Sequence, residues 1–156
     1  MTPWSASFKS IDSNLTTFMR RHGVALLRVS VGIVFLWFGF LKFFPGLSPA
    51  EDLATRTIDV LSFGMVPPRV ALNILAAWET TVGLGLIFGV YLRATLLLLW
   101  LQMIGTVAPV FLFPDAVFNH LPYAPTLEGQ YIIKNLVLAS AGLVVGAIVR
   151  DPRTSD

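Results

Sequence analysis

A long apolar run with a basic residue near each end constrains this chain more than any other feature. It occupies residues 26–44, LLRVSVGIVFLWFGFLKFF, and thirteen uncharged residues separate Arg28 from Lys42. At about 1.5 Å per helical residue, those thirteen cover only about 20 Å of a hydrocarbon layer roughly 30 Å thick. Each basic side chain must therefore reach the membrane surface or find a partner inside it. Arg28, Phe35 and Lys42 recur every seven residues, so they share one helix face that we expect to point inward.

The composition of the whole chain supports a membrane protein. Of its 156 residues, 55% are hydrophobic and 13% are charged, whereas soluble domains carry about 25% charged residues. The net charge of +2 comes without a basic run, so we expect no nucleic-acid partner. The chain has no cysteine, which excludes thiolate chemistry, iron–sulfur ligation and covalent haem attachment through cysteine.

Three more apolar segments follow the first span, which we place at residues 24–44. They cover residues 70–92, 94–113 and 130–149. The second segment contains Glu79 but also eleven Leu, Ile, Val or Phe residues. At about −0.3 to −0.6 kcal/mol each, these outweigh the roughly +3 kcal/mol of a central acidic residue. We therefore predict an all-α fold, a four-helix transmembrane bundle.

The segments outside the spans have distinct patterns. Residues 1–23 repeat apolar side chains at helical spacing, which predicts a cytoplasmic amphipathic segment on the membrane surface; a signal peptide is the alternative. Residues 48–64 are too polar to span, and Ser48, Pro49 and Glu51 suit the N-cap, N1 and N3 positions of a helix. We expect an amphipathic surface helix there, between spans 1 and 2. The division is thus 1–23, a membrane domain at 24–149 and a cytoplasmic tail at 150–156.

Basic residues in the short connections predict the orientation. One side of the membrane would hold six of them and the other only Arg56 and Arg69. The six are Lys9, Arg20, Arg21, Arg93, Arg150 and Arg153. Since the basic side faces the cytoplasm, we expect both termini there and a multi-pass protein of the cell inner membrane. His22 and His120 would then lie on opposite sides, so we expect no metal site.

Several polar side chains fall inside the predicted spans. On a common helical rise, Lys42, Glu79 and Lys134 occupy the same half of the membrane, with Gln102 near Glu79 and Asn135 beside Lys134. We expect Glu79 to pair with Lys42, Lys134 or both. The candidate ligand or charge cluster is Arg28, Lys42, Glu79, Gln102, Lys134 and Asn135.

Each of these polar side chains has an alternative to pairing inside the bundle. Arg28, Lys42 and Lys134 could instead extend to the interface, and Glu79 could be protonated or face another subunit. A paired cluster could hold helices together only, or line a ligand or proton site.

Small residues mark the expected helix contacts, and no catalytic motif accompanies them. Glycines permit close helix approach in membranes. The positions are Gly32, Gly39, Gly83, Gly85, Gly89, Gly142 and Gly146. The chain contains no Gly-rich phosphate loop, no hydrolase triad and no H-E-x-x-H. We therefore assign no catalytic residue from the sequence.

The pattern of these residues resembles the DoxX-like family of small four-helix integral membrane proteins. The resemblance rests on the run 26–44 with its charges and glycines, on the mid-span Glu79 followed by Gly83, and on Lys134–Asn135 opening the last span. It implies kinship with a membrane thiosulfate:quinone oxidoreductase subunit. Some members are linked to redox-stress complexes, and distant eukaryotic relatives act as cargo receptors or assembly chaperones.

From the residues and the resemblance together we expect an accessory subunit of a redox-linked membrane complex. Its partners would be the lipid bilayer and other membrane subunits or further copies of itself. The alternatives are a quinone-linked oxidoreductase subunit of the thiosulfate:quinone type, a small-molecule transporter and an assembly chaperone. Whether the chain is an enzyme stays open. We expect no covalent cofactor, and a quinone is the cofactor left open.

Overall fold

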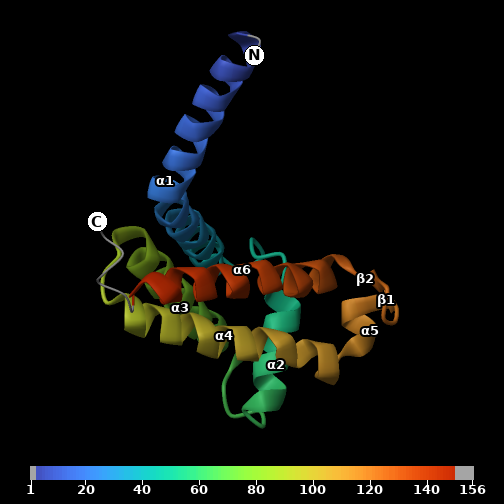
Figure 1. Cartoon of the computed structure of the whole chain (residues 1–156). Helices are drawn as coiled ribbons and strands as arrows, with labels where there is room; N and C mark the ends of the chain where they lie inside the picture. The colour runs from blue at the N-terminus through green and yellow to red at the C-terminus, as the bar shows by residue number, and fades with distance from the viewer. Residues whose placement is uncertain (1–2, 150–156) are drawn as a thin grey trace.

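The computed structural model describes the backbone of residues 3–149 and the side chains of residues 11–149 (Figure 1). The elements are α1 (Pro3–Leu41), α2 (Glu51–Leu61), α3 (Pro68–Phe88), α4 (Leu92–Leu112), α5 (Pro114–Val117), β1 (Phe118–His120), β2 (Ala124–Pro125) and α6 (Leu127–Val149). Within the described residues, four helices are long and apolar enough to cross a membrane, namely α1 from Ile11 onward, α3, α4 and α6. The prediction of four membrane-length helices is confirmed.

The four long helices pack in two pairs that share one core. Helix α1 lies mainly against α3 and α4 lies mainly against α6, while α2 contacts α3 and α4. Figure 1 shows α4 and α6 running side by side, with α2 crossing α4. The central cluster of buried apolar side chains includes Phe35, Val82, Leu86, Leu99 and Val145. The core therefore draws on every long helix, because each contributes one apolar face.

Glycines set the close approach of α1 to α3. A Cβ on Gly39 would lie 2.7 Å from the Cβ of Glu79, and one on Gly83 would lie 2.5 Å from the backbone nitrogen of Leu36. A Cβ on Gly32 would meet the Gly83 carbonyl oxygen at 3.0 Å. These distances are shorter than side chains tolerate, so the two backbones touch only because the positions are glycine.

The remaining predicted packing glycines lie against α4 or at a helix end. Gly85 faces Thr95, Gly142 faces Leu99 and Gly146 faces Leu96. Gly89 is the C-cap of α3 and has a left-handed backbone with φ +69°. Glycine suits that position because other residues rarely adopt it.

The N-terminal segment is not a separate helix. Helix α1 runs from Pro3 to Leu41 without a break, so the boundary expected at residue 23 lies inside it. Figure 1 shows the N-terminal part of α1 projecting away from the other helices. The first span also ends earlier than residue 44, because Lys42 and Phe43 belong to the turn that follows Leu41. The side chain of Lys9, together with Arg150, Arg153 and the tail 150–156, lies outside the described residues.

The helix expected after span 1 is present, but its predicted cap is wrong. Ala50 is the N-cap of α2 and makes no side-chain capping hydrogen bond. Ser48 and Pro49 precede the helix, and Ser48 is buried. The carboxylate of Glu51 accepts a hydrogen bond from the backbone N–H of Gly46 at 2.7 Å. That carboxylate therefore ties the preceding loop to the helix instead of completing a capping box.

The connection between the predicted spans 94–113 and 130–149 contains regular structure. It holds α5 and a two-stranded antiparallel hairpin that pairs Phe118 with Pro125 and His120 with Ala124. The Thr126 hydroxyl donates to the carbonyl oxygen of Ala116 at 2.7 Å and accepts from the N–H of Gly129 at 3.0 Å. Sequence reasoning missed these elements because both strands are too short to show alternation.

Candidate functional site

Glu79 lies at the centre of a polar cluster between three helical segments. Its Oε2 atom is 2.6 Å from Nζ of Lys42, and its Oε1 atom accepts a hydrogen bond from Nε2 of Gln102 at 2.7 Å. The Lys42 ammonium also donates to the carbonyl oxygen of Phe38 at 3.4 Å. Both oxygens of the acidic side chain are thus occupied.

Local sequence explains why these three groups meet. Glu79 shares the buried face of α3 with Ala76 and Val82, which are fully buried, because residues three apart share a helix face. Gln102 follows Leu99 on the buried face of α4. Lys42 stands just past the end of α1, where Gly39 lets the α1 backbone touch α3 at Glu79. The long Lys42 stem then spans the remaining gap.

The cluster forms part of the wall of a cavity of about 560 Å³. The rest of its lining is mostly apolar and comes from α1, α2, α3, α4 and α6. Among these side chains are Phe38, Leu53, Leu75, Met103 and Leu138. We call this space the apolar cavity. Its size and its few convergent polar groups are typical of small-molecule sites.

One buried atom in the wall lacks a hydrogen bond. Oε1 of Gln102 is buried and has no partner among the described residues, while Nε2 of the same amide is engaged by Glu79. Buried polar atoms are nearly always paired in folded proteins. This carbonyl is therefore an available acceptor beside the apolar cavity.

Lys134 does not join the ion pair. It lines the apolar cavity together with Asn135 and Glu128, but its ammonium lies over the ring of Tyr131, 5.9 Å from the ring centre. Sequence reasoning left the choice between Lys42 and Lys134 open, and the ion pair among the described side chains is with Lys42. Helix α6 packs mainly on α4 and less on α1, and Lys134 is exposed on it, so the ammonium beside Glu79 is that of Lys42.

Arg28 lies apart from the cluster. Its guanidinium donates to the backbone carbonyl oxygens of Leu86 and of Ile87, the latter at 3.2 Å. These carbonyls belong to the last turn of α3, where the helix leaves acceptors without internal partners. Arg28 thus caps α3 and does not line either of the two cavities described here.

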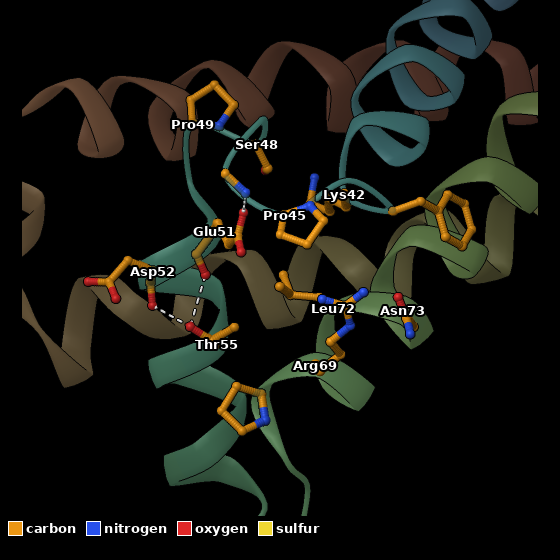
Figure 2. Close-up of a pocket in the computed structure, with 13 residues that line it drawn as sticks. Lys42, Pro45, Ser48, Pro49, Glu51, Asp52, Thr55, Arg69, Leu72 and Asn73 are labelled. Carbon is orange, nitrogen blue, oxygen red and sulfur yellow. Dashed lines mark hydrogen bonds between the residues drawn. The ribbon is translucent and has the colours of Figure 1, made fainter.

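A second cavity of about 510 Å³ adjoins the first and is more polar. Its lining comes from the α1–α2 connection, the start of α2 and the start of α3, including Glu51, Asp52, Arg69 and Asn73 (Figure 2). We call it the polar cavity. Sequence reasoning missed both cavities and the buried Ser48, which lines both of them, because no residue pattern encodes the space between helices.

The arrangement combines a donor and acceptors next to an apolar volume. Lys42 can donate, and Glu79 and Gln102 can accept. Among the described side chains, no group of three or more His, Asp or Glu residues is placed to hold a metal ion. The site can therefore orient the polar end of an apolar molecule and can bind or release a proton.

Comparison with known proteins places the chain in a family. A family model described as DoxX matches residues 23–114, more than half of the 156 residues. The matched part contains Lys42, Glu79 and Gln102 and ends before α6. None of the curated proteins and none of the solved structures compared with the chain is significantly similar to it. With four helices of membrane-spanning length and composition, the chain belongs to the DoxX family of membrane proteins.

Proposed function

We propose that this protein binds a lipid-soluble ligand with a polar head, of the quinone class, as an accessory subunit of a redox-linked membrane complex. The observation that carries the proposal is an apolar cavity of about 560 Å³ with Lys42, Glu79 and Gln102 in its wall. A ring with carbonyl or hydroxyl oxygens and an apolar tail fits that chemistry. Lys42 would donate to a carbonyl oxygen, and the free carbonyl of Gln102 would accept from a hydroxyl group.

The route into the cavity supports a ligand that arrives from the bilayer. Several lining residues of α1 and α6 are also exposed on the outside of the bundle, among them Val34, Phe38, Lys134 and Val137. The rings of Phe38 on α1 and Tyr131 on α6 both line the cavity and meet edge to face, with their centres 6.4 Å apart. A cavity whose lining includes side chains exposed on two membrane-length helices suits a lipid-soluble molecule better than a water-soluble one.

The chain's composition supports an accessory role. Without cysteine, the chain offers no thiolate for a cluster or for persulfide chemistry. Electrons for a bound quinone would come from a redox centre on a partner subunit. The projecting part of α1 carries Ile11, Leu15 and Phe18, each more than half exposed, and we assign this surface to that partner.

The proposed topology follows the distribution of basic residues. Both ends of the bundle-forming chain would lie in the cytoplasm, and α2 and the hairpin β1–β2 would lie at the outer face of the cell inner membrane. The amphipathic α2 buries Leu53 and Thr57 against the bundle. Its more exposed residues, Val60 and Leu61, would contact the interfacial region of the bilayer.

Ligand binding can be tested directly on protein purified in a mild detergent. Mass spectrometry of co-purified lipids would identify a retained quinone, and titration with a short-tailed quinone would give its Kd. The variant Gln102→Leu removes the free acceptor and should weaken binding about tenfold, as expected for the loss of about 1.4 kcal/mol. Gly105→Ala is the matched control on α4, because a Cβ there meets nothing within 4 Å.

Two results would contradict the ligand proposal. One is the absence of saturable quinone binding by the folded wild-type protein. The other is equal affinity in Gln102→Leu and Gly105→Ala. The accessory role is tested separately, by cross-linking in membranes through a photoreactive residue at Leu15; adducts with lipid alone would contradict it.

A further inference from the structure

The two cavities meet at three residues. Lys42, Ser48 and Pro49 line both the apolar cavity and the polar cavity. Lys42 is the titratable member of the three. Figure 2 shows it at the edge of the polar cavity, with Glu51 and Asp52 on one side and Arg69 and Asn73 on the other. The partition between the cavities is therefore built around one ionisable side chain.

The polar cavity lies where water meets the bundle. Its walls are the turn after α1, the first turns of α2 and the first turns of α3. The turn after α1 and the start of α3 lie at the ends of membrane-length helices. Asp52, Arg69 and Asn73 are exposed. Glu79 lines the apolar cavity and not the polar one. From the polar cavity, the carboxylate is thus reached through the ammonium of Lys42, 2.6 Å from its Oε2 atom.

We propose that Lys42 is a proton relay between the polar cavity and the intramembrane carboxylate of Glu79. In the first step one N–H bond of the Lys42 ammonium breaks and one O–H bond forms at Oε2, leaving a neutral amine beside a neutral acid. In the second step a hydronium ion in the polar cavity returns a proton to Nζ. One proton has then moved from water to Glu79, the cluster has gained one positive charge, and no electron has moved.

The groups around Glu79 hold its carboxylate in place and leave the path of the proton from the polar cavity through Lys42 unobstructed. Gln102 on α4 does not titrate, and it fixes Oε1 so that Oε2 faces Lys42. On α6, Glu128 and Lys134 line the apolar cavity, with Lys134 against Tyr131. On α2, Glu51 and Asp52 line the polar cavity, and on α3 Arg69 does so. The relay is a property of this cluster whether or not a quinone binds.

The wild-type protein alone can test the relay in sealed proteoliposomes. Dicyclohexylcarbodiimide dissolves in the bilayer and reacts with protonated carboxyl groups, and peptide mass spectrometry distinguishes Glu79 from Glu128. We expect the labelling rate of Glu79 to rise as the pH falls in the compartment that the polar cavity faces, by up to about tenfold per pH unit. It should not follow the pH of the opposite compartment.

The orientation of the protein can be measured because the chain has no cysteine. Asn119 is exposed in β1, which follows the end of α4 and so lies at the same end of the bundle as the polar cavity. The variant Asn119→Cys, reacted with a membrane-impermeant maleimide, reports which side faces outward. A labelling rate at Glu79 that follows the opposite compartment, or neither compartment, would overturn the relay.

Variants then assign the relay to Lys42. Lys42→Met should abolish the dependence of Glu79 labelling on the pH of the polar-cavity side. Arg69→Gln is the matched control, because Arg69 lines the polar cavity alone, and it should keep the full dependence. A Lys42→Met protein that still follows the same compartment would refute the assignment.

Discussion

The ion pair between Lys42 and Glu79 predicts an unequal response to neutralising its two members. In Lys42→Met, the Glu79 carboxylate stays in an apolar wall with only the hydrogen bond from Gln102. Removing one partner of a buried pair costs about 3–5 kcal/mol, because the other charge is left uncompensated. That corresponds to a loss of more than about a hundredfold in the ratio of folded to unfolded protein.

The reverse change should cost much less. In Glu79→Gln, the Lys42 side chain keeps its long flexible stem and already lines the polar cavity, so its ammonium can turn to water. The amide of residue 79 can still accept from Gln102. We expect a cost of about 1 kcal/mol, as for one lost hydrogen bond. The double variant should lie near Glu79→Gln, which gives a coupling energy of about 3–5 kcal/mol between the two positions.

Unfolding in mixed micelles of increasing dodecyl sulfate content, followed by tryptophan fluorescence, measures these free energies. Thr81→Val is a control on the same helix, because Thr81 is exposed and its hydroxyl donates to the carbonyl oxygen of Ala77 one turn earlier in α3. The reasoning fails if Glu79→Gln destabilises the protein more than Lys42→Met does. It also fails if the two single effects simply add in the double variant.

Three further predictions concern helix packing and capping. Gly83→Ala should lower the free energy of unfolding by about 1–3 kcal/mol, because its Cβ would lie 2.5 Å from the backbone nitrogen of Leu36; the same micelle assay measures this. Gly105→Ala should leave stability equal or slightly higher, since alanine is the better helix former and the space is open; a lower midpoint would contradict it. Arg28→Gln should cost about 1–2 kcal/mol through lost hydrogen bonds to charged donors. Faster amide exchange in the last turn of α3 would locate that effect, because Arg28 binds its carbonyl oxygens.

The helices could be predicted because each one carries its own signal. Residues 68–88, 92–112 and 127–149 are helical, within a few residues of the segments expected from hydropathy alone. The lipid solvent imposes this, since every backbone polar group in a membrane must be paired within the segment. At the N-terminus, α1 continues through residue 23 without a break, so hydropathy marks where the apolar run begins and not where the helix begins.

The polar cluster could be predicted only in part. Depth along a helix follows from residue number, so the common level of Glu79 and Gln102 was readable from spacing, and the structure joins them at 2.7 Å. The choice of Lys42 over Lys134 was not readable. It depends on how α6 is rotated and how far it stands from α3, and those are set by the packing of Gly142 and Gly146 on α4.

The sequence by itself determined that the chain spans a membrane, where its helices lie, and which charged side chains need a partner inside the helix bundle. The reason is local, since composition and helical rise act one segment at a time. Only the tertiary structure decided that Lys42 forms the ion pair with Glu79, that Arg28 caps α3, and that two cavities meet at Lys42 and Ser48. Cavities and partners arise from the rotations and distances between helices, which no single segment encodes.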